Sequence, residues 1–163
     1  MHELTFRDDD LRLVYLATVY HLGRPGSEID AQTLEPHRLG LGPLREQLDR
    51  QLDQQAATVE LTDYQLTRLG QALHGIANEL KQYEMAQRRS AVPGFAEAMQ
   101  RLFPGNEREP GTSLDLVEKT IMLRRRLDGA VAGAESAVAA ARKQQESAAA
   151  VGARRPWWKL WRR

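Results

Sequence analysis

The chain of 163 residues is 42% hydrophobic and 28% charged, values typical of one globular domain with a hydrophobic core. It contains no cysteine, which excludes disulfide bonds, cysteine-ligated zinc and thiol nucleophiles. The formal net charge of +1 hides an asymmetry: residues 1–60 hold 6 Lys/Arg and 11 Asp/Glu, whereas residues 111–163 hold 11 and 5, which favours an anionic partner for the C-terminal end.

The first ten residues, MHELTFRDDD, are acidic and lack the apolar stretch of a secretory signal. No apolar run approaches the roughly 18 residues that span a bilayer, so we expect a cytoplasmic protein. Residues 9–22 are apolar nearly all round and are followed by Gly23 and Pro25, a pattern that predicts a buried helix. The three aspartates at 8–10 suit the start of that helix; we assign no metal to them, because adjacent side chains there point apart.

Residues 23–43 contain three prolines and four glycines, which predicts a long connection with little helix. We interpret it as surface chain that crosses the end of a helical bundle. The alternative is a small-ligand site lined by Glu28, Asp30, Glu35, His37 and Arg38.

A second helix is predicted over residues 43–56, with Pro43 in its first turn. Its narrow apolar stripe is formed by Leu44, Leu48 and Leu52. The remaining positions are polar, so we expect this helix at the surface. Val59 and Leu61 then lead into the next helix.

The segment from residue 61 to residue 88 carries the clearest helical pattern in the chain. Apolar residues recur at alternating spacings of 3 and 4, ending on a glutamine: Leu66, Leu69, Leu73, Ile76, Leu80, Tyr83 and Gln87. Thr62 and Gln65 match a capping box at its start. We predict a central helix with a wide buried face. His74 falls on its polar side and is interpreted as a solvated histidine.

Two further helices are predicted. The first runs from about residue 93 to residue 103. Its apolar side comprises Phe95, Ala98, Met99, Leu102 and Phe103. We interpret this side as part of the core; the alternative is that it lines a pocket. The second spans residues 112–150, with an apolar face of Leu116, Val117, Ile121, Leu123, Leu127 and Val131. An alanine-rich stretch follows, which should also be helical. We interpret it as an extended spacer. The alternative is that the protein forms a homo-oligomer in which this helix pairs with its copy through residues such as Gly129 and Gly133.

The last residues, ARRPWWKLWRR, have a composition unlike that of a core. They hold all three tryptophans of the protein and five cations: Arg154, Arg155, Trp157, Trp158, Lys159, Leu160, Trp161, Arg162 and Arg163. The segment is similar in composition to Trp/Arg-rich membrane-active peptides. Indole rings settle at lipid headgroups and cations are attracted to anionic lipid, so we predict membrane-surface binding. The alternatives are a protein groove, single-stranded nucleic acid, and packing against the protein itself.

No nucleophile–base pair, phosphate loop or zinc motif is visible, and the four histidines are scattered. We therefore expect no enzyme, no catalytic residue, no cofactor and no metal. The predicted fold is an all-α bundle of about five helices with a long C-terminal helix. Its predicted parts are a core at 1–131, an alanine-rich extension at 132–152 and the Trp/Arg tail at 153–163. The predicted function is a cytoplasmic adaptor, peripheral at the inner membrane face, with protein docking and nucleic-acid binding as alternatives.

Overall fold

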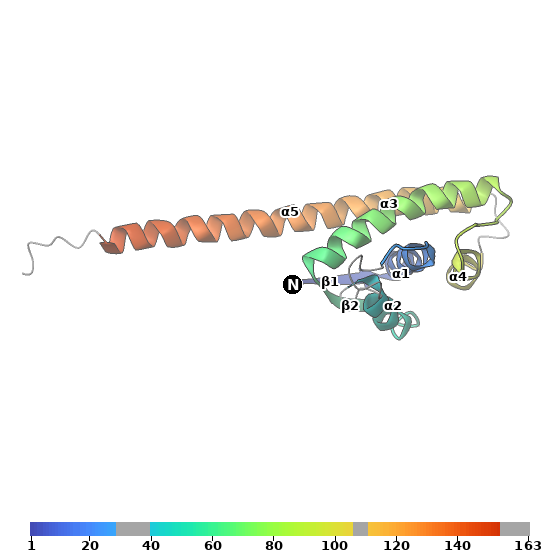
Figure 1. Ribbon diagram of the computed structural model, residues 1–163, viewed down its shortest axis with the longest axis horizontal. Helices are drawn as coiled ribbons and strands as arrows, with labels where there is room; N and C mark the ends of the chain where they lie inside the picture. Colours follow the sequence, from blue (N-terminus) through green and yellow to red (C-terminus); the bar gives the residue numbers. More distant parts are fainter. Residues whose placement is uncertain (29–39, 106–110, 154–163) are drawn as a thin grey trace, which may run out of the picture. The chain divides into compact units, whose positions relative to one another are not determined.

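The computed structural model describes residues 1–28, 40–105 and 111–153, which are mostly helical (Figure 1). In chain order these residues form β1 (His2–Arg7), α1 (Asp8–Gly23), α2 (Leu41–Asp49), β2 (Ala56–Leu61), α3 (Asp63–Met85), α4 (Phe95–Leu102) and α5 (Thr112–Ala153). The chain divides into two compact units, Met1–Leu127 and Asp128–Arg163.

A two-stranded antiparallel sheet corrects the all-α prediction. β1 pairs with β2 in a register that runs from His2 opposite Leu61 to Arg7 opposite Ala56. In β2, buried residues alternate with exposed ones, which is the period-2 pattern of a strand with one covered face. On the other face the hydroxyl oxygens of Thr5 and Thr58 lie 2.9 Å apart. The pairing strands are separated in sequence by α1 and α2.

Helix α1 contacts α2, α3, α4 and both strands. Nine of its 16 residues are buried, which confirms the prediction from its apolar circumference that it lies inside the protein. The Tyr20 ring of α1 lies against Gly75 of α3, where an added Cβ atom would lie 2.8 Å from Tyr20 Cζ. The centre of this unit is therefore α1, with α3 covering one side of it.

Helix α3 begins with the predicted capping box. The Gln65 amide donates to the Thr62 hydroxyl at 3.2 Å, and the Thr62 amide donates to Gln65 Oε1 at 3.0 Å. The predicted apolar stripe is buried from Leu66 to Tyr83. The helix ends at Met85, because Gln87 adopts a left-handed conformation with φ 52° and no longer belongs to the stripe.

Helix α2 is shorter than the predicted helix at 43–56. It begins at Leu41 and ends at Asp49, and residues 56–61 form β2 instead. The Asp49 carboxylate accepts hydrogen bonds at 3.0 Å from the Tyr15 hydroxyl and from Arg101 Nη1. The bond from Tyr15, followed by that from Arg101, lowers the pKa of Asp49. Asp49, the last residue of α2, is thus linked by hydrogen bonds to α1 and to α4. The helix predicted at 43–56 would have continued beyond this residue.

The apolar side of the short helix α4 is buried in the core, as the favoured interpretation of this segment expected. Phe95 is completely buried and makes edge-to-face contacts with Tyr20 and Tyr83, at centroid distances of 6.3 Å and 5.9 Å. Gly94, with φ 77°, precedes it in the left-handed conformation that glycine adopts without strain. The aromatic cluster packs α4 against α1 and the end of α3.

Candidate functional site

The helix that leads to the Trp/Arg tail is α5, whose 42 residues measure about 63 Å along the helix axis. Its first part belongs to the Met1–Leu127 unit. Six residues at helical spacing are buried there: Ser113, Leu116, Val117, Thr120, Leu123 and Leu127. The helix continues as α5 through Gly152 to Ala153. A buried stripe thus fastens the start of α5 to the compact unit.

Ion pairs fix the register of this first part of α5. Lys119 Nζ lies 2.5 Å from an Asp9 carboxylate oxygen, and Arg126 Nη2 lies 2.6 Å from one of Asp10. The hydrogen bond that the Lys119 ammonium donates to Asp9 raises the pKa of Lys119. Both pairs are partly exposed, and each contributes about 0–1 kcal/mol. The buried stripe therefore supplies most of the attachment, and the aspartates select the register.

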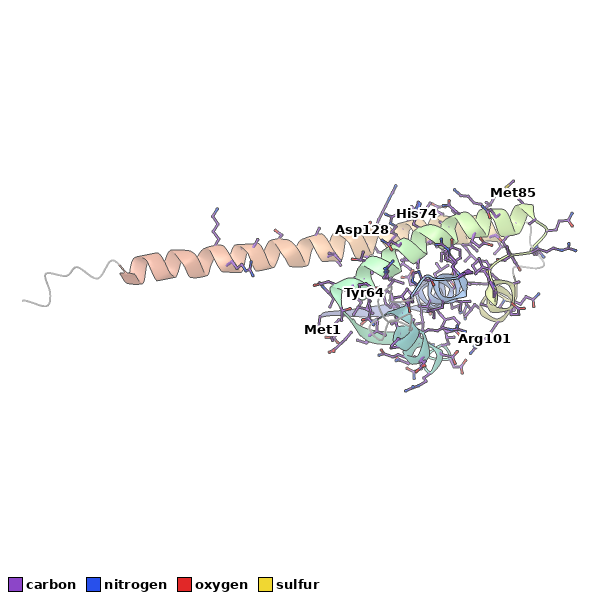
Figure 2. All side chains as sticks on the ribbon, in the orientation of Figure 1. Met1, Tyr64, His74, Met85, Arg101 and Asp128 are labelled. Atoms are coloured by element: carbon purple, nitrogen blue, oxygen red, sulfur yellow. The ribbon has the colours of Figure 1, made fainter. Side chains whose placement is uncertain are left out.

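Of the three aspartates at 8–10, Asp9 and Asp10 thus act as ion-pair partners of α5. Within the described ranges, no group of three or more His, Cys, Asp or Glu is placed to hold a metal ion. His74 lies on the exposed side of α3 (Figure 2), where Arg124 Nη1 of α5 approaches its Nδ1 at 3.0 Å.

One residue of the predicted apolar face of α5 points the other way. Ile121 is 40% exposed, as are Leu114 at 53% and Met122 at 54%. Since each helical residue turns by about 100°, Ile121 cannot share a face with both Leu116 and Leu123. The prediction for Ile121 was wrong, and this residue belongs to an exposed face.

A buried polar cluster joins α1, α2 and α3. Glu28 accepts a hydrogen bond at 2.5 Å from the amide of Leu41, the first residue of α2, and lies 3.4 Å from His21 Nε2. The side chains of His21 and Glu28 are 7% and 8% exposed. Gln65 Nε2 donates to the Gly40 carbonyl at 3.1 Å. A carboxylate at a helix N-terminus is favourable because it accepts from an otherwise unsatisfied amide and complements the helix dipole.

The cluster also explains the glycine at position 40. A Cβ atom there would lie 2.7 Å from Glu28 Oε1 and still closer to the rest of the carboxylate. The ligand-site alternative would have used Glu28 to bind a small molecule, whereas in the structure Glu28 accepts from the first amide of α2. The other residues of that alternative, Asp30, Glu35, His37 and Arg38, lie outside the described residues.

Burial lowers the pKa of His21, and the cations Arg68 and Arg24 act in the same direction, whereas Glu28 opposes them. Between the lowered pKa of His21 in the folded state and the ordinary value of 6.5, the unfolded state therefore binds more protons than the folded state. The free energy of unfolding contributed by neutral His21 is complete above that value and falls as the pH drops below it.

We expect His21→Gln to reduce the slope of unfolding free energy against pH between about pH 7 and about pH 5. The measurement is urea unfolding by circular dichroism across that range. His74→Gln, which removes an exposed histidine on α3, serves as the control and should retain the slope. An unchanged slope in His21→Gln would contradict the assignment.

The predicted tail site, with its indoles and cations at 154–163, lies outside the described residues. No helix of the described chain is long and apolar enough to cross a membrane. No family model, curated protein or solved structure matches this chain. Three features of the chain itself therefore bear on its function: a compact helical unit, the helix α5 whose start is fastened to it, and the composition of the Trp/Arg tail.

Proposed function

We propose that the protein is a non-enzymatic cytoplasmic adaptor whose Trp/Arg tail docks on an anionic membrane surface. The observation that carries the proposal is compositional. All three tryptophans of the chain, together with five cations and no acidic residue, fall within residues 154–163. Amphipathic indole rings and cations are the two side-chain types that a lipid headgroup layer attracts.

The expected strength of this docking is modest. Each Lys or Arg near an anionic surface contributes about 1 kcal/mol, so the five cations contribute up to about 5 kcal/mol before screening. Salt reduces this contribution, because the Debye length is only about 8 Å at physiological ionic strength. The indoles add an apolar contribution that salt does not screen, since it depends on transfer from water into the headgroup layer.

The described part of the chain suits a carrier for such a segment. The buried stripe and the ion pairs of Lys119 and Arg126 hold the start of α5 to the compact unit. The same helix continues to Ala153, the residue before the tail's first cation. The proposed adaptor therefore links whatever the compact unit binds to the surface that the tail binds.

The test is co-sedimentation with phosphatidylcholine vesicles that contain or lack phosphatidylserine. The full chain should sediment with anionic vesicles, and added salt should weaken the association. A chain ending at Ala153 should stay in the supernatant. Replacing the three tryptophans by alanine should reduce binding while barely changing the melting temperature. Equal binding to neutral and anionic vesicles, or binding to neither, would contradict the proposal.

A single-stranded DNA titration separates the membrane proposal from a nucleic-acid role. We expect little affinity at physiological salt. Tight binding that falls steeply as salt rises would favour phosphate contacts and base stacking instead.

A further inference from the structure

The start of α5 carries an exposed apolar face that no described residue of the compact unit covers. In the described parts of the chain the large exposed hydrophobic residues are Met1, Met85, Leu114, Ile121 and Met122. Three of these fall on α5 within nine residues. Isolated exposed hydrophobic residues are ordinary, but a cluster on one helix face indicates an interaction surface.

Helical geometry places two charged residues on the same face. At about 100° per residue, Glu118 and Arg125 lie in line with Leu114, Ile121 and Met122, on the side opposite the buried stripe. Both are exposed, and neither has an ion-pair partner among the described residues. In contrast, the neighbouring cations Lys119 and Arg126 are paired with aspartates of α1.

The charges on this face would complement those of the same face on a second, antiparallel copy of α5. If two copies of α5 lie antiparallel with Ile121 of each against Met122 of the other, Glu118 of each copy faces Arg125 of the other. The arrangement is isologous, so every favourable contact occurs twice about a two-fold axis. A parallel pair would instead bring like charges together at both positions.

We propose that this surface, the 114–125 face, is the contact between two antiparallel copies of the chain. Ile121 and Met122 form its centre, the two Glu118–Arg125 ion pairs flank them, and Leu114 lies at its outer edge. With only five side chains from each copy, the contact belongs to the class of small, reversible interfaces. We therefore expect the dimer to have a dissociation constant in the micromolar range. The inference does not depend on the membrane proposal, because it uses residues of the compact unit alone.

The test is sedimentation velocity of the full chain between about 1 and about 200 µM, the range in which small interfaces associate. The weight-average mass should rise toward a dimer with concentration. Glu118→Arg and Arg125→Glu should each weaken association about ten-fold, because each change places like charges together twice. The double variant restores opposite charges and should return the association to within a few-fold of the unmodified protein.

Two controls distinguish this contact from other causes of association. Met85→Glu adds a charge at a residue that is 84% exposed at the end of α3 (Figure 2), and should leave the dimer intact, whereas Ile121→Glu should abolish it. The chain ending at Ala153 should still dimerise. Loss of the dimer on that truncation, a monomer at every concentration, or a double variant that fails to recover would overturn the proposal. Circular dichroism of each variant verifies that the compact unit is folded.

Discussion

Replacing Leu73 with aspartate is expected to unfold the Met1–Leu127 unit. Leu73 is completely buried in α3, as are Leu69 and Ile76 on either side of it in the stripe. Truncation of a buried leucine to alanine alone costs about 2–5 kcal/mol. A buried carboxylate without a partner adds several kcal/mol, so the sum reaches the entire stability of a typical domain, about 5–15 kcal/mol. Circular dichroism should show loss of helix and of the cooperative transition.

A matched variant separates the effect of the site from the effect of the charge. Asn78→Asp introduces the same carboxylate at an exposed position of the same helix and should change the unfolding free energy by about 0.5 kcal/mol or less. Ile76→Asp should behave like Leu73→Asp. A cooperative melting transition in Leu73→Asp at the unmodified temperature would remove α3 from the core.

The helices were predictable because each one carries a local signal. The apolar recurrence from Leu66 to Tyr83, the capping pair Thr62 and Gln65, and the apolar circumference of α1 all depend on residues within a few turns. The strands carry only weak local signals. β1 and β2 hold six residues each, and no short turn joins them, so their alternating patterns identify neither strand as the partner of the other.

The buried polar cluster was unpredictable for the same reason. His21, Glu28 and Leu41 come together only after α1, the turn beyond its C-terminus and α2 have packed, and no spacing rule connects them. Ile121 shows a different limit. The prediction assigned Ile121 to the buried stripe because it is hydrophobic and close in sequence to stripe residues. Its angular position around the helix, at about 100° per residue, places it on the exposed side. That angle was available in the sequence, and it is the observation that indicates the 114–125 face.

Two glycines of α3 should respond in opposite directions to the same substitution. Among the residues that the structure describes, no neighbour would come within 4 Å of a Cβ atom at Gly70, whereas a Cβ at Gly75 would lie 2.8 Å from Cζ and 2.9 Å from the hydroxyl oxygen of Tyr20. Gly70→Ala should stabilise the protein by up to about 1 kcal/mol, because alanine favours the helix. Gly75→Ala gains the same propensity but overpacks the contact with α1 at a cost of about 1–3 kcal/mol.

The Tyr20 ring cannot turn aside freely, because it packs edge-to-face on Phe95 and lies 5.6 Å from the guanidinium carbon of Arg24. The sign of the Gly75 effect should therefore depend on Tyr20. In a Tyr20→Ala background the obstruction is absent, and Gly75→Ala should become stabilising, as Gly70→Ala is in the unmodified protein. Urea unfolding of the four proteins in this cycle gives the coupling directly. Additive effects would mean that α1 and α3 do not meet at this point, and the packing of the whole unit around α1 would have to be revised.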